Sequence, residues 1–116
     1  MAPEPLAGDP FEALGDAHRR TILRLLSDGE GSVQEIADAL PISRPAVSRH
    51  LRVLRDAGLV TARAEGTRRL YRLHDAGVEA VEAYLRQTWG DAVRRFALLA
   101  DNTTEAGGGG RARGPA

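Results

Sequence analysis

Two predicted helices, separated by only the three residues 41–43, constrain this chain more than any other feature of its sequence. Ser32 and Glu35 form a capping-box pattern at the start of one apolar-striped segment, and Pro41 ends that segment. Ser43 can then cap a second helix, with Pro45 in its first turn, where the missing N–H costs nothing. Two short helices joined by so short a break predict a helix-turn-helix.

The second helix of this pair has two unlike faces. Val47, Leu51 and Leu54 recur at helical spacing, so they predict a face that is buried against the rest of the domain. The opposite face carries short polar or basic side chains, as a helix that enters the major groove of DNA requires. The residues expected on this outward face are Ser43, Arg44, Ser48, Arg49 and Arg52.

These outward residues are expected to have different roles at DNA. Arg44 lies near the start of the helix, where base edges are usually reached, so we expect it to read guanine, with Ser48 as the second candidate. Arg49 and Arg52 are expected to bind phosphates, which fix the register without reading sequence. His50 is also counted as a DNA-binding residue that donates to a phosphate, but a half-buried histidine with satisfied hydrogen bonds is an equal alternative.

Signals on both sides of this pair predict a mainly α-helical chain with one small β-hairpin. Pro10 begins a short first helix, and a second apolar-striped helix is expected to end at Gly29. After Gly58 the apolar pattern alternates, which predicts two strands, and a final striped helix follows. The expected order is α-α-α-α-β-β-α, a winged helix-turn-helix. The later elements are strands at 59–64 and 69–73 and a helix from 75 to about 100.

Both ends of the 116-residue chain are expected to be flexible tails. Residues 1–8 are rich in Pro, Ala and Gly, and residues 102–116 include four consecutive glycines. Neither stretch can bury enough apolar surface to order itself. The sequence therefore predicts one folded domain, residues 9–101, for both DNA binding and dimerisation.

The zero net charge of the chain hides a strongly basic central block. All sixteen basic residues are Arg, and eight of them lie between Ile42 and Leu73 against two acidic residues, which gives this block a charge of +6. The remainder of the chain therefore has a net charge of −6. A basic block confined to one region indicates an anionic partner, and Arg suits bidentate hydrogen bonds to phosphate or guanine.

The expected hairpin adds basic residues to those of the helix. Arg68 and Arg69 at its turn and Arg63 on the facing strand suit a wing that lies along the DNA backbone or the minor groove. Tyr71 and Leu73 alternate with polar positions and are expected in the core. Aromatic residues are only 4% of the chain, which argues against single-stranded nucleic acids bound by base stacking.

Three segments of the central region carry a family resemblance. They read S-R-P-A-V-S-R-H-L at 43–51, L-R-D-A-G-L-V at 54–60 and G-T-R-R-L-Y-R-L at 66–73. With the residues before them, from Asp16 on, they resemble the DNA-binding core of the ArsR/SmtB-type bacterial transcriptional regulators. The resemblance implies a homodimeric repressor whose partners are a pseudo-palindromic operator in double-stranded DNA and a second copy of the chain.

The resemblance also implies a dimer interface formed by the first and last helices. The apolar pattern agrees, because a final helix of about 26 residues would be nearly 40 Å long, more than the diameter of so small a domain. Such a helix could not bury its apolar stripe within one copy. The residues expected in the interface are Phe11, Leu14, Val81, Tyr84, Leu85, Trp89, Val93 and Phe96.

No metal, cofactor or thiol sensor is expected. The chain has no Cys, which excludes disulfides, thiolate metal ligands and cysteine nucleophiles. Its three histidines, His18, His50 and His74, are far apart in sequence and lack a paired spacing such as i, i+4. The resemblance is therefore closest to the metal-independent members of the family.

These observations together predict a sequence-specific transcriptional regulator that is not an enzyme. The chain has no glycine-rich phosphate loop inside a folded region and no adjacent nucleophile and base. It also has no apolar run of bilayer length and no secretory signal pattern, so we expect no membrane partner and a place in the bacterial cytoplasm. The alternative is a winged-helix interaction module whose Arg-rich face binds an acidic protein. A small-molecule effector stays an open possibility.

Overall fold

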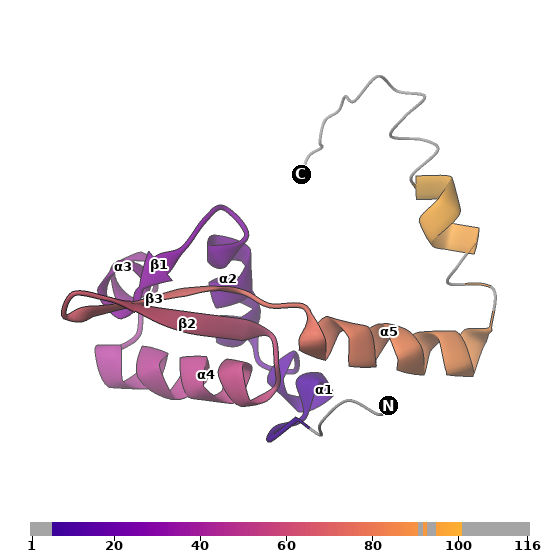
Figure 1. The fold of residues 1–116 in the computed structure, drawn as a ribbon, viewed down its shortest axis with the longest axis horizontal. Coiled ribbons are helices and arrows are strands. Elements are labelled where there is room, and N and C mark those ends of the chain that lie inside the picture. The colour runs from indigo at the N-terminus through magenta and orange to yellow at the C-terminus, as the bar shows by residue number, and fades with distance from the viewer. Residues whose placement is uncertain (1–5, 91, 93–94, 101–116) are drawn as a thin grey trace. The chain divides into compact units, whose positions relative to one another are not determined.

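A computed structural model of the chain describes residues 6–90, 92 and 95–100. The chain divides into two compact units, one ending at Val81 and the other beginning at Glu82. The first unit has the expected helix-turn-helix followed by a hairpin (Figure 1). In chain order the elements are α1 (Pro10–Ala13), α2 (Ala17–Leu26), β1 (Gly31–Ser32), α3 (Val33–Ala39), α4 (Arg44–Asp56), β2 (Val60–Glu65), β3 (Arg68–Leu73) and α5 (Ala76–Trp89).

Side-chain caps fix where the helices begin. The Asp9 carboxylate accepts a hydrogen bond from the Phe11 N–H at the start of α1. Ser32 and Glu35 form the predicted capping box at α3, in which each side chain accepts a hydrogen bond from the other residue's N–H. Ser43 caps α4 by accepting from the Ala46 N–H. The predicted starts of these three helices are therefore confirmed.

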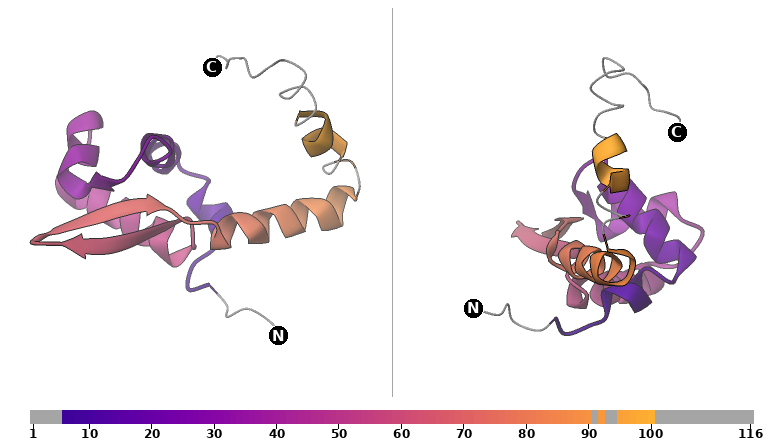
Figure 2. Two further views of the ribbon diagram at one scale, coloured as in Figure 1. Left: turned by 45° about the horizontal axis from the view of Figure 1, so that its top comes forward. Right: turned by 90° about the vertical axis from the view of Figure 1, so that its right-hand side faces the viewer.

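The wing is a three-stranded antiparallel sheet in the order β1-β3-β2. β2 and β3 are joined by a two-residue turn in which Gly66 has a φ of +64°, a conformation that favours glycine. Figure 2 shows this turn extending beyond the helices. The strand β1 was not predicted, because two residues carry no periodicity; it forms only because Gly31 pairs with Tyr71 of β3.

The core of the first unit lies where α2, α3 and α4 meet each other and the sheet. It includes Ile22, Ile36, Val47, Leu51 and Leu54, all at most 2% exposed. Tyr71 also joins this core, as predicted. The same prediction was wrong for Leu73, which is 44% exposed. Leu73 ends β3, beyond the helices that cover Tyr71, and lines an apolar hollow with Val78 instead.

The last helix is shorter than predicted. α5 ends at Trp89, and Gly90 follows with a φ of +59°, the left-handed conformation that commonly ends a helix. Residues 92 and 95–100 are helical but lie beyond this break. At about 1.5 Å per residue, α5 is about 21 Å long rather than nearly 40 Å. The expectation of one helix from 75 to about 100 is therefore wrong, and so is the argument for dimerisation from its length.

A close backbone approach fixes the first turn of α5 against the end of α4. The Gly77 N–H donates to the Gly58 carbonyl at 2.8 Å. A Cβ on Gly77 would lie only 2.3 Å from the Ala57 carbonyl oxygen, so this contact requires glycine. None of the helices that the structure describes is long and apolar enough to cross a bilayer.

Candidate nucleic-acid interface

The helix α4 has the two faces that the sequence predicts. Val47, Leu51 and Leu54 are buried against the core. The predicted outward residues are all exposed, and they follow the helix from its N-terminal cap to its third turn. These exposed residues are Ser43, Arg44, Ser48, Arg49 and Arg52. The helix-turn-helix therefore presents a polar and basic surface while its apolar side holds it on the domain.

The arginines of α4 are electrostatically uncompensated. Among the residues that the structure describes, no carboxylate forms an ion pair with Arg44, Arg49 or Arg52. All three residues are exposed. A phosphate backbone could bind them without first displacing an intramolecular partner.

Arg63 of the wing is in a different environment. Its guanidinium forms two hydrogen bonds to the Glu30 carboxylate, at 3.0 Å from Nε and 2.9 Å from Nη2. Glu65 lies 3.6 Å from the same Nη2. The hydrogen bonds from Arg63 hold the pKa of Glu30 below its ordinary value. Arg63 was predicted to contact DNA, but here it joins the wing to the loop before β1.

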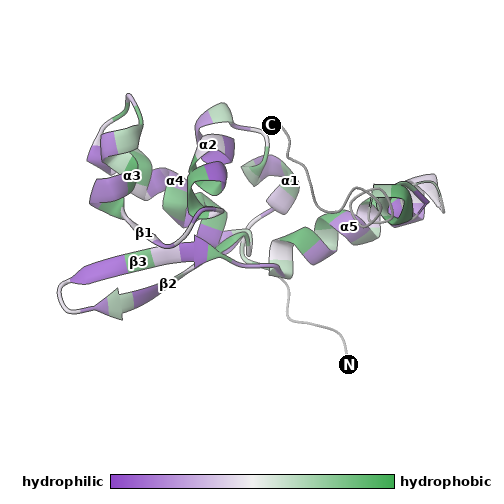
Figure 3. Cartoon of the chain, turned by 90° about the horizontal axis from the view of Figure 1, so that it is seen from above, coloured by the Kyte–Doolittle hydropathy of each residue, from purple (hydrophilic) through white to green (hydrophobic). Residues whose placement is uncertain are grey.

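Arg68 is also paired, although more loosely. Its Nη2 lies 3.6 Å from Oε1 of Glu35, the oxygen that accepts the Ser32 N–H in the capping box of α3. The hydrogen bonds from Ser32, with a smaller contribution from the Arg68 charge, keep the pKa of Glu35 below its ordinary value. Arg69, the other predicted residue of the turn, is exposed. The start of β3, next to the hairpin turn, is strongly hydrophilic (Figure 3).

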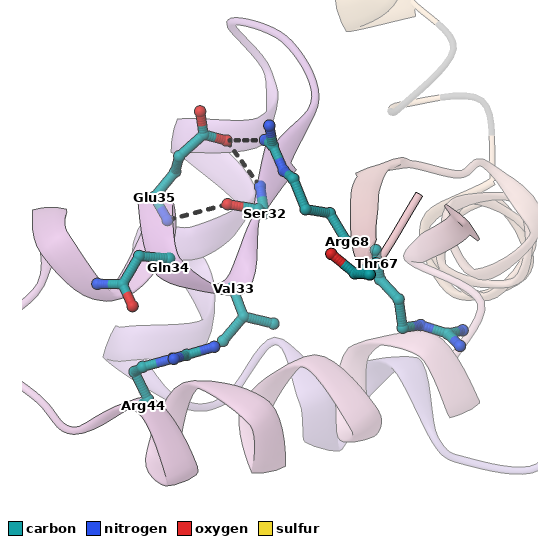
Figure 4. Close-up of a pocket in the computed structure, with 8 residues that line it drawn as sticks. Ser32, Val33, Gln34, Glu35, Arg44, Thr67 and Arg68 are labelled. Atoms are coloured by element: carbon teal, nitrogen blue, oxygen red, sulfur yellow. Dashed lines mark hydrogen bonds and ion pairs between the residues drawn. The ribbon is translucent and has the colours of Figure 1, made fainter. Parts of the chain in front are cut away.

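A hollow separates the start of α4 from the wing. It has a volume of about 520 Å³ and is bounded by the first turns of α3 and α4 and by the hairpin turn. Figure 4 shows Arg44 entering it from α4 and Arg68 reaching across it to Glu35. The hollow thus brings together three arginines from two elements, Arg44, Arg68 and Arg69, against one carboxylate.

His50 does not extend from the outward face with the arginines of α4. It is partly buried, and its Nδ1 lies 3.4 Å from Nη1 of Arg19 on α2. Its ring centroid is 5.9 Å from that of His18. Burial lowers the pKa of His50, despite the opposing charge of Asp16. This position favours the alternative of a satisfied, half-buried histidine over a phosphate contact.

Sequence reasoning missed the neighbours of His50. Asp16 caps α2 by accepting from the Arg19 N–H at 3.1 Å, and this hydrogen bond lowers the pKa of the Asp16 carboxyl. One ligand atom each of Asp16, His18 and His50 lies within 4.8 Å of the others. Sequence spacing gave no sign of this cluster, because His50 lies thirty-two positions after His18.

The residues predicted for a dimer interface retain apolar surface. In the first unit, Phe11 is 44% exposed, and Leu14 and Val81 are partly buried. In the second unit, Tyr84, Trp89 and Phe96 are 48%, 57% and 74% exposed, and Leu85 is partly buried. Tyr84 and Trp89 contact each other edge to face, with centroids 6.5 Å apart. Val93 lies outside the described residues.

This geometry defines a class of protein. A helix-turn-helix whose second helix exposes arginines that no described carboxylate pairs with, followed by a hairpin with further arginines, is a winged helix-turn-helix of the DNA-binding type. Residues 16–62 match the family model described as "Bacterial regulatory protein, arsR family". Relatives with 34–45% identity match 74–80% of the chain, and the chain belongs to this family.

The relatives match about three quarters or more of the chain. The HTH-type transcriptional regulator Rv2034 of Mycobacterium tuberculosis is 45% identical over 92 residues, which is 79% of this chain and 86% of the relative. A crystal structure of a possible transcriptional regulator for arsenical resistance has 42% identity and a TM-score of 0.64, with 80% of this chain and 95% of that one covered. The homodimeric winged helix-turn-helix domain Mb0332 of Mycobacterium bovis has 34% identity and a TM-score of 0.56, with 74% and 80% covered.

The family assignment confirms several predictions. The chain is a DNA-binding transcriptional regulator of the ArsR family and not an enzyme. The mainly helical winged helix-turn-helix fold with a small hairpin is also confirmed. The roles of single residues at DNA and at a dimer interface remain predictions, and the structure contributes their positions.

Proposed function

We propose that this chain is a homodimeric repressor that binds a pseudo-palindromic operator through α4. One observation carries the proposal: the outward face of α4 is basic, exposed and not paired with any described carboxylate, although acidic and basic residues are equal in number over the whole chain. Such a surface binds phosphates with release of counterions. A bacterial regulator of this kind acts in the cytoplasm, where its DNA lies.

Within this proposal, the residues of α4 divide between readout and positioning. Arg44 begins the helix, so it reads guanine in the major groove, and Ser48 contacts a base one turn further along. Arg49 and Arg52 bind phosphates on either side of the groove. The hollow between α4 and the wing takes the backbone of one strand, with Arg68 and Arg69 of the wing beside it.

Dimerisation is supported by apolar surface that one copy leaves exposed. Phe11 on α1 and Val78 on α5 are both nearly half exposed, and Leu14 and Val81 line an apolar hollow of about 290 Å³ with Val78. The Mycobacterium bovis relative is described as homodimeric. A symmetric pair would place the two copies of α4 about 34 Å apart, one turn of DNA.

The first test is binding to the DNA upstream of the chain's own gene, measured by fluorescence anisotropy in EDTA. DNA binding as proposed needs no metal, so EDTA should not weaken it. We expect tighter binding than to a scrambled duplex and a steep loss of affinity with salt. Equal, salt-insensitive binding to both duplexes, or none at physiological salt, would favour the acidic-protein alternative.

The second test is the association state, measured by sedimentation equilibrium together with Trp89 fluorescence. We expect a dimer at micromolar concentration, and emission of Trp89 that shifts to shorter wavelength as the dimer forms, because burial removes water from the indole. A monomer at all concentrations, with unchanged water-exposed emission, would remove the dimer from the proposal.

A further inference from the structure

A cluster of side chains of the metal-binding types joins α2 to α4. Asp16 is the N-cap of α2, His18 lies in the first turn of α2, and His50 lies on α4 between the buried and exposed faces. One ligand atom of each lies within 4.8 Å of the other two. His50 lies thirty-two positions after His18 in the sequence, so only the folded chain brings the two histidines together.

The donor set fits a specific class of ion. Two imidazole nitrogens and one carboxylate oxygen are ligands that Zn²⁺, Co²⁺ and Ni²⁺ accept, and they leave a position for water. Zn²⁺ bonds of about 2.0–2.2 Å in a tetrahedral site place neighbouring ligand atoms about 3.3 Å apart. The present separations, all within 4.8 Å, must therefore contract by at most about 1.5 Å, which requires small rotations of the Asp16, His18 and His50 side chains.

We propose that Asp16, His18 and His50 bind a divalent transition-metal ion of the zinc type, with water completing the coordination. None of the three residues is among the arginines and serines of α4 that are proposed to contact DNA, and only His50 lies on that helix. No metal site was expected from the sequence, because its histidines lack the i, i+4 spacing of two ligands on one helix. That reasoning does not apply to ligands that come from two different helices.

Two features of the cluster support ligand competence. Burial lowers the pKa of His50 and so favours the neutral imidazole, which is the form that binds metal. Asp16 needs one oxygen to cap α2, where it accepts from the Arg19 N–H, and its carboxylate has a second oxygen. Capping and metal binding are therefore compatible.

Arg19 opposes metal binding and limits the affinity. Its Nη1 lies 3.4 Å from His50 Nδ1, and its positive charge disfavours a nearby cation. The same guanidinium is held by two other acceptors, the carbonyls of Ala13 at 2.9 Å and Glu12 at 3.2 Å. It can therefore give up the His50 contact without losing its anchorage, and the ion binds at the expense of one weak hydrogen bond.

The test uses the full chain without a histidine tag, freed of metal and titrated with Zn²⁺. The three histidines give a small set of imidazole proton resonances in NMR spectra. We expect the signals of His18 and His50 to shift together at one equivalent of Zn²⁺, and the signal of His74 to stay in place. Calorimetry of the same titration gives the affinity, and Co²⁺ absorption reports the coordination geometry.

Three variants assign the ion to this cluster. His18→Gln removes an exposed ligand, and Asp16→Asn removes the carboxylate while keeping a good helix cap, so both variants should fold. Each should lower Zn²⁺ affinity at least about tenfold. His74→Gln is the matched control, because His74 also has a carboxylate nearby, Asp75 at 4.0 Å, but lies outside the cluster.

The outcomes separate this proposal from the proposed function. Unchanged Zn²⁺ affinity in both cluster variants with native circular dichroism, a shift confined to His74, or no saturable binding would each overturn the metal site. None of these results concerns DNA binding, which is measured in EDTA. Conversely, a chain that binds Zn²⁺ here but no DNA would overturn only the proposed function.

Discussion

The recognition helix and the wing carry the same residue type in two different electrostatic states. In α4, Arg44, Arg49 and Arg52 have no described carboxylate as a partner. In the wing, Arg63 forms a bidentate pair with Glu30, and Arg68 lies near Glu35. A count of arginines in the sequence does not distinguish the two regions. The structure distinguishes them, because of these five arginines only those of the wing lie near described carboxylates.

The difference indicates how each region contributes to binding. The helix arginines can meet DNA at once, whereas a wing arginine must first exchange a carboxylate for a phosphate. Part of the favourable contact is therefore offset by the lost ion pair. We expect α4 to supply most of the affinity and the sequence discrimination, and the wing to supply a smaller contribution that is independent of sequence.

The largest effect is expected for Arg44→Ala. Because Arg44 is placed to read a base, the change should cost roughly 1–3 kcal/mol per protomer on the operator and relax specificity at one base pair. The measurement is anisotropy with the operator and a set of single-base variants. Arg24→Ala, which removes one exposed arginine from α2, is the charge-matched control. Equal losses on operator and scrambled DNA would remove Arg44 from the readout role.

Two smaller changes in DNA affinity, opposite in sign to each other, are expected at the wing. Arg68→Ala should weaken binding to all sequences alike and lower the salt slope by at most about 1. Glu35→Gln removes the competing charge but keeps a residue type suited to the capping box, so it should raise affinity by roughly two- to fivefold. Both are measured on operator and scrambled duplexes. A loss of affinity in Glu35→Gln with unchanged helix content would show that Arg68 needs this partner for its position.

Glu30→Gln is expected to act on the fold more than on DNA binding. The change breaks the bidentate pair with Arg63, whose pKa the Glu30 hydrogen bonds raise, and should lower the melting temperature by about 1–4 °C. Thermal unfolding of Glu30→Gln, Arg63→Gln and the double variant isolates the interaction. If the two single changes are additive in the double variant, the pair contributes nothing to stability.

The smallest expected effect is a dependence of stability on acid pH. Hydrogen bonds keep the pKa of Glu30 and Asp16 below their ordinary values, so the folded state binds fewer protons than the unfolded state. This stabilisation is complete above about pH 4.5 and is lost as the pH falls through the lowered pKa values. Urea unfolding between about pH 5 and pH 3 measures it, and Glu30→Gln should flatten the curve. An unchanged curve would mean that the pair leaves the proton balance of unfolding unaffected.

Most of the fold could be predicted because its signals are local. A capping serine, a first-turn proline and an apolar stripe lie within a few residues of one another, as at Ser43, Pro45 and Val47, and they fix α4 without knowledge of the rest. Two features of the fold were not predicted, one because it forms only in the folded chain and the other because it depends on a single residue. β1 forms only against β3, and Gly90 ends α5 although the apolar pattern continues beyond it.

The candidate site was predictable only in part for the same reason. The outward face of α4 follows from helical periodicity, so its residues could be named in advance. The Arg63–Glu30 pair and the Asp16, His18 and His50 cluster join residues about thirty positions apart or more, and no local pattern reports such contacts. The two alternatives for His50 depended on which element faces it, and its contact with Arg19 of α2 favours the half-buried one.

The salt dependence of DNA binding tests the central claim most directly, because its slope counts the phosphates that arginines neutralise. We predict that Arg49→Ala combined with Arg52→Ala lowers the magnitude of the slope by about 2 per protomer. Arg63→Ala combined with Arg68→Ala should lower it by no more than about 1. An equal or larger decrease from the wing pair, with little change from the helix pair, would contradict the account.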